Sequence, residues 1–79
     1  MKYVYILESL AESGHFYTGI TDDLKARLSA HNAGDVSHTS KYSPWAINTY
    51  VAFTSEERAY AFEKYLKSAS GRAFAKKRL

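Results

Sequence analysis

Two tyrosines and one arginine in the first third of the chain have the residue types needed for phosphodiester chemistry. Tyr5 lies in the apolar run at residues 3–7, Tyr17 in the run at residues 16–20, and Arg27 follows on a predicted helix. A guanidinium can bind two phosphate oxygens at once, and a tyrosine hydroxyl can orient or deprotonate an attacking water. Aromatic residues are also common in strands, so the two tyrosines alone are a weak signal.

The two apolar runs predict a β-hairpin, with residues 9–14 as the connection. If Tyr5 pairs opposite Tyr17, then Tyr3 pairs opposite Gly19, and both hydroxyls emerge on the same face of the sheet. A shift by one residue would place the hydroxyls on opposite faces. The predicted site therefore depends on the strand register.

The helix that carries Arg27 is predicted to begin near Thr21 or Asp22 and to end at Gly34, which suits a left-handed C-terminal stop. Arg27 and His31 are four residues apart and are therefore neighbours on this helix. This spacing places a second titratable side chain beside the arginine.

The rest of the chain predicts a loop, a strand and two helices. Residues 34–44 are polar and read as a loop, and residues 46–53 alternate as a third strand. Thr54 and Glu57 form a predicted capping box that begins the next helix. The order strand, strand, helix, loop, strand, helix, helix predicts an α+β fold in one domain over residues 1–79.

Length and composition limit the class of protein. A chain of 79 residues buries only about 60% of its unfolded surface, so one small core must stabilise it. The chain has no cysteine, which excludes disulfides and thiolate metal sites. The first apolar run is too short for a signal-peptide core or a membrane span, and we therefore expect a cytoplasmic protein.

Positive charge is concentrated at the C-terminus, although the net charge is only +3. Six of the eleven basic residues lie in the last sixteen positions without an acid: Lys64, Lys67, Arg72, Lys76, Lys77 and Arg78. This cluster predicts salt-sensitive contacts with nucleic-acid phosphates, and its last three members lie far in sequence from the tyrosines. The alternative is a solvated helix whose cations favour its C-terminal dipole. In the polar loop, His38, Thr39, Ser40 and Lys41 are either further phosphate contacts or simply exposed to solvent.

Glu63 is the acid with the most unusual position. Ala59, Phe62 and Leu66 form the apolar stripe of the predicted second helix, and Glu63 projects close to that stripe. A half-buried carboxylate is costly unless it is paired or binds a cation, so Glu63 is a metal ligand, an ion-pair partner, for instance of Arg27, or an edge residue that extends its carboxylate to solvent. Because Mg²⁺ keeps several waters, one such acid can support a one-metal site.

Assembled, these residues resemble the GIY-YIG endonuclease superfamily. Within it, the chain is most similar to small stand-alone bacterial proteins that are excinuclease-C-like, with the fold of the nuclease domain of the ABC excinuclease. The matching segments are Tyr-Val-Tyr-Ile-Leu at 3–7, Phe-Tyr-Thr-Gly-Ile at 16–20, Arg-Leu-Ser-Ala-His-Asn-Ala-Gly at 27–34, Pro-Trp at 44–45, Glu-Lys-Tyr-Leu-Lys-Ser at 63–68 and Gly-Arg-Ala-Phe-Ala-Lys-Lys-Arg-Leu at 71–79.

The resemblance implies a three-stranded antiparallel sheet packed with three helices, in the order β-β-α-β-α-α. By position, the functional residues of the family fall on Tyr5, Tyr17, Gly19, Arg27, His31 and Glu63. Glu63 matches the metal ligand, Arg27 the catalytic arginine and Gly19 the motif glycine. The implied activity is Mg²⁺- or Mn²⁺-dependent cleavage of nucleic acid, with DNA as the expected substrate. Either tyrosine can be the base, with His31 as a proton relay.

Three departures from the family pattern keep two other classes of function open. Tyr3 replaces a motif glycine, Ile20 stands where the excinuclease domain has lysine, and no asparagine follows Glu63. The first alternative is a catalytically weak or silent nucleic-acid-binding module of the same fold. The second is an interaction domain in which the tyrosine face binds another protein.

Overall fold

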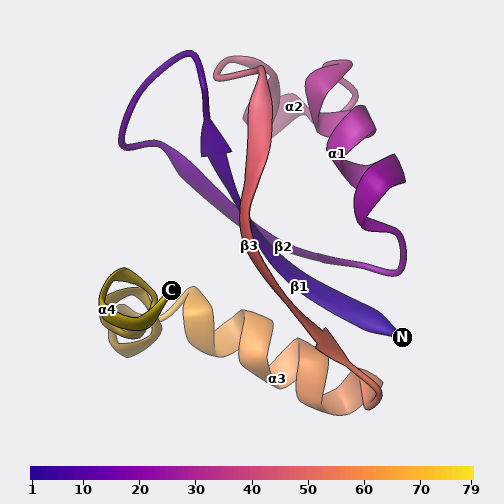
Figure 1. Ribbon diagram of the computed structural model, residues 1–79, viewed down its shortest axis with the longest axis vertical. Helices are drawn as coiled ribbons and strands as arrows, with labels where there is room; N and C mark the ends of the chain where they lie inside the picture. Colours follow the sequence, from indigo (N-terminus) through magenta and orange to yellow (C-terminus); the bar gives the residue numbers. More distant parts are fainter.

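The computed structural model describes residues 1–79 as an antiparallel sheet of three strands with helices on both faces (Figure 1). The strands are β1 (Lys2–Ser9), β2 (Phe16–Thr21) and β3 (Trp45–Phe53), in the order β2-β1-β3. The first strand is therefore central, and β2, which carries Tyr17, is an edge strand. The predicted α+β class and the three strands are confirmed.

Four helices complete the fold: α1 (Leu24–Asn32), α2 (Ser37–Ser40), α3 (Glu56–Leu66) and α4 (Ala69–Arg78). At the start of α1, the Asp23 side chain accepts a hydrogen bond from the Ala26 backbone N–H at 3.1 Å. After α1, Gly34 has φ +80°, the left-handed conformation expected of a helix stop. None of the helices is both long and apolar enough to cross a bilayer.

Two details of the predicted helices are wrong. Residues 34–44 contain the short helix α2 and are not only a loop, so the chain has four helices and not three. The cap of α3 is Ser55, whose side chain accepts from the Arg58 backbone N–H, and not Thr54. The residue three positions after Ser55 is an arginine, so the capping box expected with Glu57 does not form.

The central strand β1 divides the apolar residues between two cores. Val4 and Ile6 pack with Ala59 and Leu66 under α3, whereas Tyr5 and Leu7 belong to a second cluster. That second cluster contains Tyr5, Leu7 and Trp45, with Tyr17, Leu24, Leu28, Tyr42 and Ile47 against it. The period-2 alternation of a strand thus sends Tyr5 to the face covered by α1 and α2, opposite α3 and α4 (Figure 1).

The register of the β1–β2 hairpin differs from the predicted one by two residues. Tyr5 pairs with Gly19 and Leu7 pairs with Tyr17, so Tyr5 does not lie opposite Tyr17. Because a shift of two residues preserves the face of each side chain, both tyrosines still lie on one side of the sheet. They are diagonal neighbours, with ring centroids 6.4 Å apart.

Candidate active site

Gly19 makes room for the ring of Tyr5. The two residues are direct cross-strand partners, and a Cβ atom on Gly19 would come within 2.6 Å of the Tyr5 Cζ atom. This is far inside van der Waals contact, so the ring can lie across β2 only if position 19 has no side chain. Tyr5 is 2% exposed, and its hydroxyl reaches over Gly19 towards the edge of the sheet.

A chain of hydrogen bonds starts at α2 and ends at the arginine of α1. Thr39 Oγ1 donates to the Val36 carbonyl at 3.2 Å, so it accepts from His31 Nδ1 at 2.7 Å. The other ring nitrogen, Nε2, then lacks a proton and accepts from the Tyr5 hydroxyl at 3.0 Å. The Tyr5 oxygen accepts in turn from Arg27 Nε at 3.3 Å. This pattern of donors fixes the Nδ1–H tautomer of His31.

Arg27 is held against Tyr5 through its Nε atom. Its Nε–H donates to the Tyr5 hydroxyl at 3.3 Å, and Tyr17 also interacts with the guanidinium. The pKa of Arg27 is raised by the hydrogen bond with Tyr5, which outweighs the opposing effect of burial, and Tyr17 adds to the rise. The half-buried guanidinium is therefore a fixed cation beside both tyrosines.

Burial holds the two partners behind Arg27 in their neutral forms. Desolvation raises the pKa of Tyr5 above its usual value near 10, and the hydrogen bond from Arg27 offsets this only in part. Desolvation lowers the pKa of His31 below 6.5, and the charge of Arg27 lowers it further. His31 is fully buried. Near pH 7 both groups are uncharged, which suits residues that orient Arg27.

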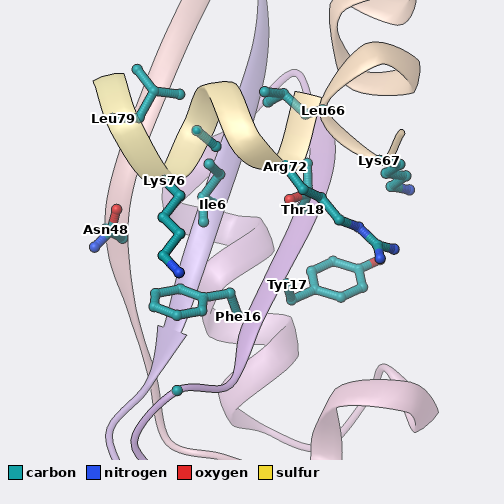
Figure 2. A pocket seen from close by; sticks show the side chains of 12 residues that line it. Ile6, Phe16, Tyr17, Thr18, Asn48, Leu66, Lys67, Arg72, Lys76 and Leu79 are labelled. Carbon is teal, nitrogen blue, oxygen red and sulfur yellow. The ribbon is translucent and has the colours of Figure 1, made fainter. Parts of the chain in front are cut away.

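Tyr17 lies at the wall of a cleft beside α4 (Figure 2). The cleft has a volume of about 880 Å³ and runs between the sheet and the C-terminal half of the chain. Its lining includes Phe16, Tyr17, Asn48, Lys67, Arg72 and Lys76. Tyr17 is half-buried, in contrast to Tyr5, and of the two tyrosines it alone lines the cleft.

Glu63 forms an ion pair, but not with Arg27. Its carboxylate is 18% exposed and lies 2.7 Å from Lys67 Nζ, one helical turn later on α3. Lys67 also lines the cleft with Tyr17, so the carboxylate is close to the cleft wall. No group of three or more His, Cys, Asp or Glu side chains could hold a metal ion. Glu63 is thus a lone acid on α3 whose observed partner is Lys67.

Comparison with known proteins shows which family this chain belongs to. The model of the GIY-YIG catalytic domain matches residues 1–78. The chain belongs to the GIY-YIG family.

Relatives of this GIY-YIG domain include UPF0213 proteins of Streptococcus pyogenes. Those of serotypes M3 and M1 are each 38% identical to it over 72 residues, which cover 90% of this chain and 76% of theirs. Among solved structures, the solution NMR structure of a UPF0213 protein from Bacillus halodurans is similar, with a TM-score of 0.57 and 35% sequence identity. That match covers 96% of this chain and 81% of the other.

In this GIY-YIG domain, some of the residues predicted to contact phosphates line the cleft, and the others lie elsewhere. Lys67, Arg72 and Lys76 line the cleft with Tyr17, so these three basic residues lie closer to that tyrosine than their separation in the sequence indicates. Lys77 and Arg78 border a second, shallower hollow on α4. The polar-loop candidates His38, Ser40 and Lys41 are exposed around α2, on the opposite face of the sheet (Figure 1).

Two residues that matter for this site are not recognisable as such in the sequence. Thr39 was a candidate phosphate contact, but it is 1% exposed and its hydroxyl is used by His31, so that interpretation is wrong. Phe16 resembles an ordinary strand residue, yet it is 56% exposed and lies in the cleft. For Phe16, the sequence offers one signal, which is its position directly before the motif Tyr17. For Thr39, nothing in the sequence indicates that it pairs with His31.

Proposed function

We propose that this GIY-YIG domain is an endonuclease that hydrolyses phosphodiester bonds in nucleic acid, with DNA as its substrate. The observation that carries the proposal is the arrangement of Arg27. Its Nε is anchored on Tyr5 at 3.3 Å, and its guanidinium lies beside Tyr17, which also raises the pKa of Arg27. A rigid, permanently charged fork next to a solvent-facing tyrosine is suited to a phosphate that is attacked by water.

Arg27 would bind the non-bridging oxygens of the phosphate that is cleaved. Negative charge on these oxygens increases as water attacks, and a guanidinium already held in place stabilises it without a cost for reorganisation. Tyr5, His31 and Thr39 act behind it as positioning residues, because their hydrogen bonds fix the plane of the guanidinium. The support runs from α2 through α1 to β1, so the position of Arg27 depends on the tertiary fold.

Tyr17 is the residue we assign to the attacking water. Its ring packs 4.9 Å from the His31 ring, which limits its motion, and its side chain lines the cleft. A hydroxyl placed in this way can hold a water in line with the leaving oxygen. Tyr5 is less suited to this task, because its oxygen is buried and already has two protein partners.

Glu63 is the residue that would hold Mg²⁺ or Mn²⁺. One carboxylate suffices where waters and substrate oxygens complete the ligand set, which is the usual way in which proteins bind Mg²⁺. The side chain is 18% exposed and therefore accessible, but Lys67 must move away from it. When bound, the metal would supply Lewis-acid stabilisation of the phosphate oxygens and a more acidic water.

A catalytically silent nucleic-acid-binding module is the second candidate, and the ion pair of Glu63 favours it. Lys67 Nζ lies 2.7 Å from the carboxylate, so the lone acid already has a cationic partner. In such a module, the basic residues of the cleft would bind phosphates while no cleavage follows. Metal binding separates the two candidates, because the module would leave Glu63 paired with Lys67.

The test is a cleavage assay with purified protein in Mg²⁺ or Mn²⁺. The resemblance to the excinuclease nuclease domain suggests a panel of labelled linear, nicked, flapped and four-way DNA, with single-stranded RNA included. We expect a defined cut with the wild type and none with Arg27→Ala or Tyr17→Phe. Lys25→Ala, which removes an exposed cation on the same helix, is the matched control. Salt-dependent binding without any cut would support the silent module instead.

A further inference from the structure

The cleft beside α4 combines positive charge with an apolar floor. Lys67, Arg72 and Lys76 contribute three cations to its lining, and the lining contains no acidic residue. Lys67 is paired with Glu63, whereas Arg72 and Lys76 have no ion-pair partner. Arg72 and Lys76 are four residues apart on α4, so both project from one side of that helix into the cleft (Figure 2).

Phe16 gives this cleft an aromatic face. It begins the edge strand β2, is 56% exposed and lies directly before Tyr17. Figure 2 shows the Lys76 side chain pointing towards the Phe16 ring and the Arg72 guanidinium pointing towards Tyr17. A single exposed aromatic residue needs no explanation by itself. Here, however, the exposed ring and unpaired cations face the same cavity.

We propose that the cleft binds one unpaired nucleotide, whose base stacks on Phe16 and whose phosphate is bound by Arg72 and Lys76. Aromatic rings and cations together are the features by which proteins bind single-stranded nucleic acid. The inference rests on the proposed function in one respect, since it takes nucleic acid as the ligand. It adds the kind of strand that the protein selects and the residues that select it.

The base must be unpaired because stacked neighbours cover both faces of a base in a duplex. An aromatic side chain at a cleft wall can reach such a face only when the nucleotide has left the stack. The cleft volume of about 880 Å³ also lies within the range of about 300–1,000 Å³ that is typical of small-ligand sites. Phe16 and Tyr17 both line this cleft, so a nucleotide stacked on Phe16 would lie in the same cleft as the tyrosine assigned to the attacking water.

The experiment measures binding without cleavage, in EDTA, with fluorescently labelled oligonucleotides. A single-stranded oligomer, a flapped duplex and a blunt duplex of equal length are compared, and DNA and RNA versions of the single strand form separate arms. Phe16→Leu keeps an apolar residue but removes the stacking face. We expect it to weaken binding of the single-stranded and flapped oligomers by about five-fold or more, and so to reduce their preference over the blunt duplex. Tyr50→Leu removes an equally exposed aromatic ring outside the cleft and should leave that preference unchanged.

Two further measurements distinguish the contribution of base stacking from that of phosphate contacts, and both from cleavage activity. A 2-aminopurine base in the unpaired segment should lose fluorescence on binding the wild type but not Phe16→Leu. The variant Arg72→Gln/Lys76→Gln should flatten the slope of log affinity against log salt by about 0.7 for each phosphate of a single strand that is no longer bound. Equal affinity for duplex and unpaired strands, with fluorescence that does not depend on Phe16, would overturn the inference even if cleavage is observed. Stacking on Phe16 without any cleavage would support this inference and would reject only the proposed nuclease activity.

Discussion

The substitution Gly19→Ala tests whether the glycine of the motif exists to place the tyrosine of the neighbouring strand. A Cβ at position 19 would lie 2.6 Å from Tyr5 Cζ, whereas carbon atoms in contact are normally about 3.5–4.0 Å apart. The Tyr5 ring must therefore move by about 1 Å. It cannot move freely, because it is 2% exposed and its hydroxyl is bound on two sides.

The displacement should weaken the fold and impair catalysis by different amounts. Overpacking of a buried site typically costs about 1–3 kcal/mol in the free energy of unfolding. The bonds of the Tyr5 hydroxyl, 3.0 Å to His31 and 3.3 Å from Arg27, would stretch beyond hydrogen-bonding distance. A shift of about 1 Å in a catalytic group commonly lowers the rate by about 10²-fold. We therefore expect a folded protein with severely reduced cleavage.

Urea unfolding and single-turnover cleavage measure the two effects of Gly19→Ala separately. The matched control is the double variant Gly19→Ala/Tyr5→Leu, in which a smaller side chain removes the collision. We compare the loss in unfolding free energy caused by Gly19→Ala in two backgrounds, the wild type and Tyr5→Leu. The loss should be smaller in the Tyr5→Leu background, by at least about 1 kcal/mol. Wild-type stability and a cleavage rate within a few-fold of wild type for Gly19→Ala would refute the packing argument.

Three other predictions concern residues of the same site. Arg27→Lys should reduce single-turnover cleavage nearly as much as Arg27→Ala, by about 10²–10³-fold, because the charge remains but the fork and the Nε bond to Tyr5 are lost. A rate for the lysine variant within a few-fold of wild type would contradict this role. Lys67→Met should raise the Mn²⁺ affinity up to about five-fold in an EPR titration, because a partly exposed ion pair with Glu63 contributes at most about 1 kcal/mol, and Lys64→Met should have no effect. Since burial and Arg27 hold the pKa of His31 below 6.5, the unfolded chain takes up a proton that the folded chain does not, and the free energy of unfolding should fall as the pH drops below about 6.5. An NMR titration midpoint of the His31 ring at or above 6.5 would show that this reasoning is wrong.

Local patterns in the sequence are sufficient to predict most of the strands and helices of the fold. The apolar runs around Tyr5 and Tyr17 predict two strands, the alternation at residues 46–53 predicts the third, and Gly34 predicts the end of the first helix. Each of these signals acts over a few residues, through backbone preference or the period of the side chains. The helix α2 escapes such a prediction because four polar residues carry no periodic signal, and its formation depends on contacts such as the Thr39–His31 bond.

The sequence alone also places both tyrosines on one face of the sheet, although the partner it predicts for each is wrong. The predicted and observed registers differ by two residues, and a strand repeats every two residues, so the error leaves the faces unchanged. Only the tertiary structure shows that Tyr5 lies over Gly19 and is buried. That contact is what separates the roles of the two tyrosines, which residue types and spacing could not do.

For the charged residues, the sequence determined which were candidates and the tertiary structure decided their partners. Glu63 is recognisable from its place beside an apolar stripe, but its partner is Lys67 and not Arg27, because α1 and α3 cover opposite faces of the sheet. Arg72 belongs by sequence to a distant basic cluster, yet the turn between α3 and α4 brings it to the cleft with Tyr17. Periodicity fixes which side of its own helix or strand a residue occupies. The distance between residues of different elements depends on how those elements pack, and only the folded chain provides it.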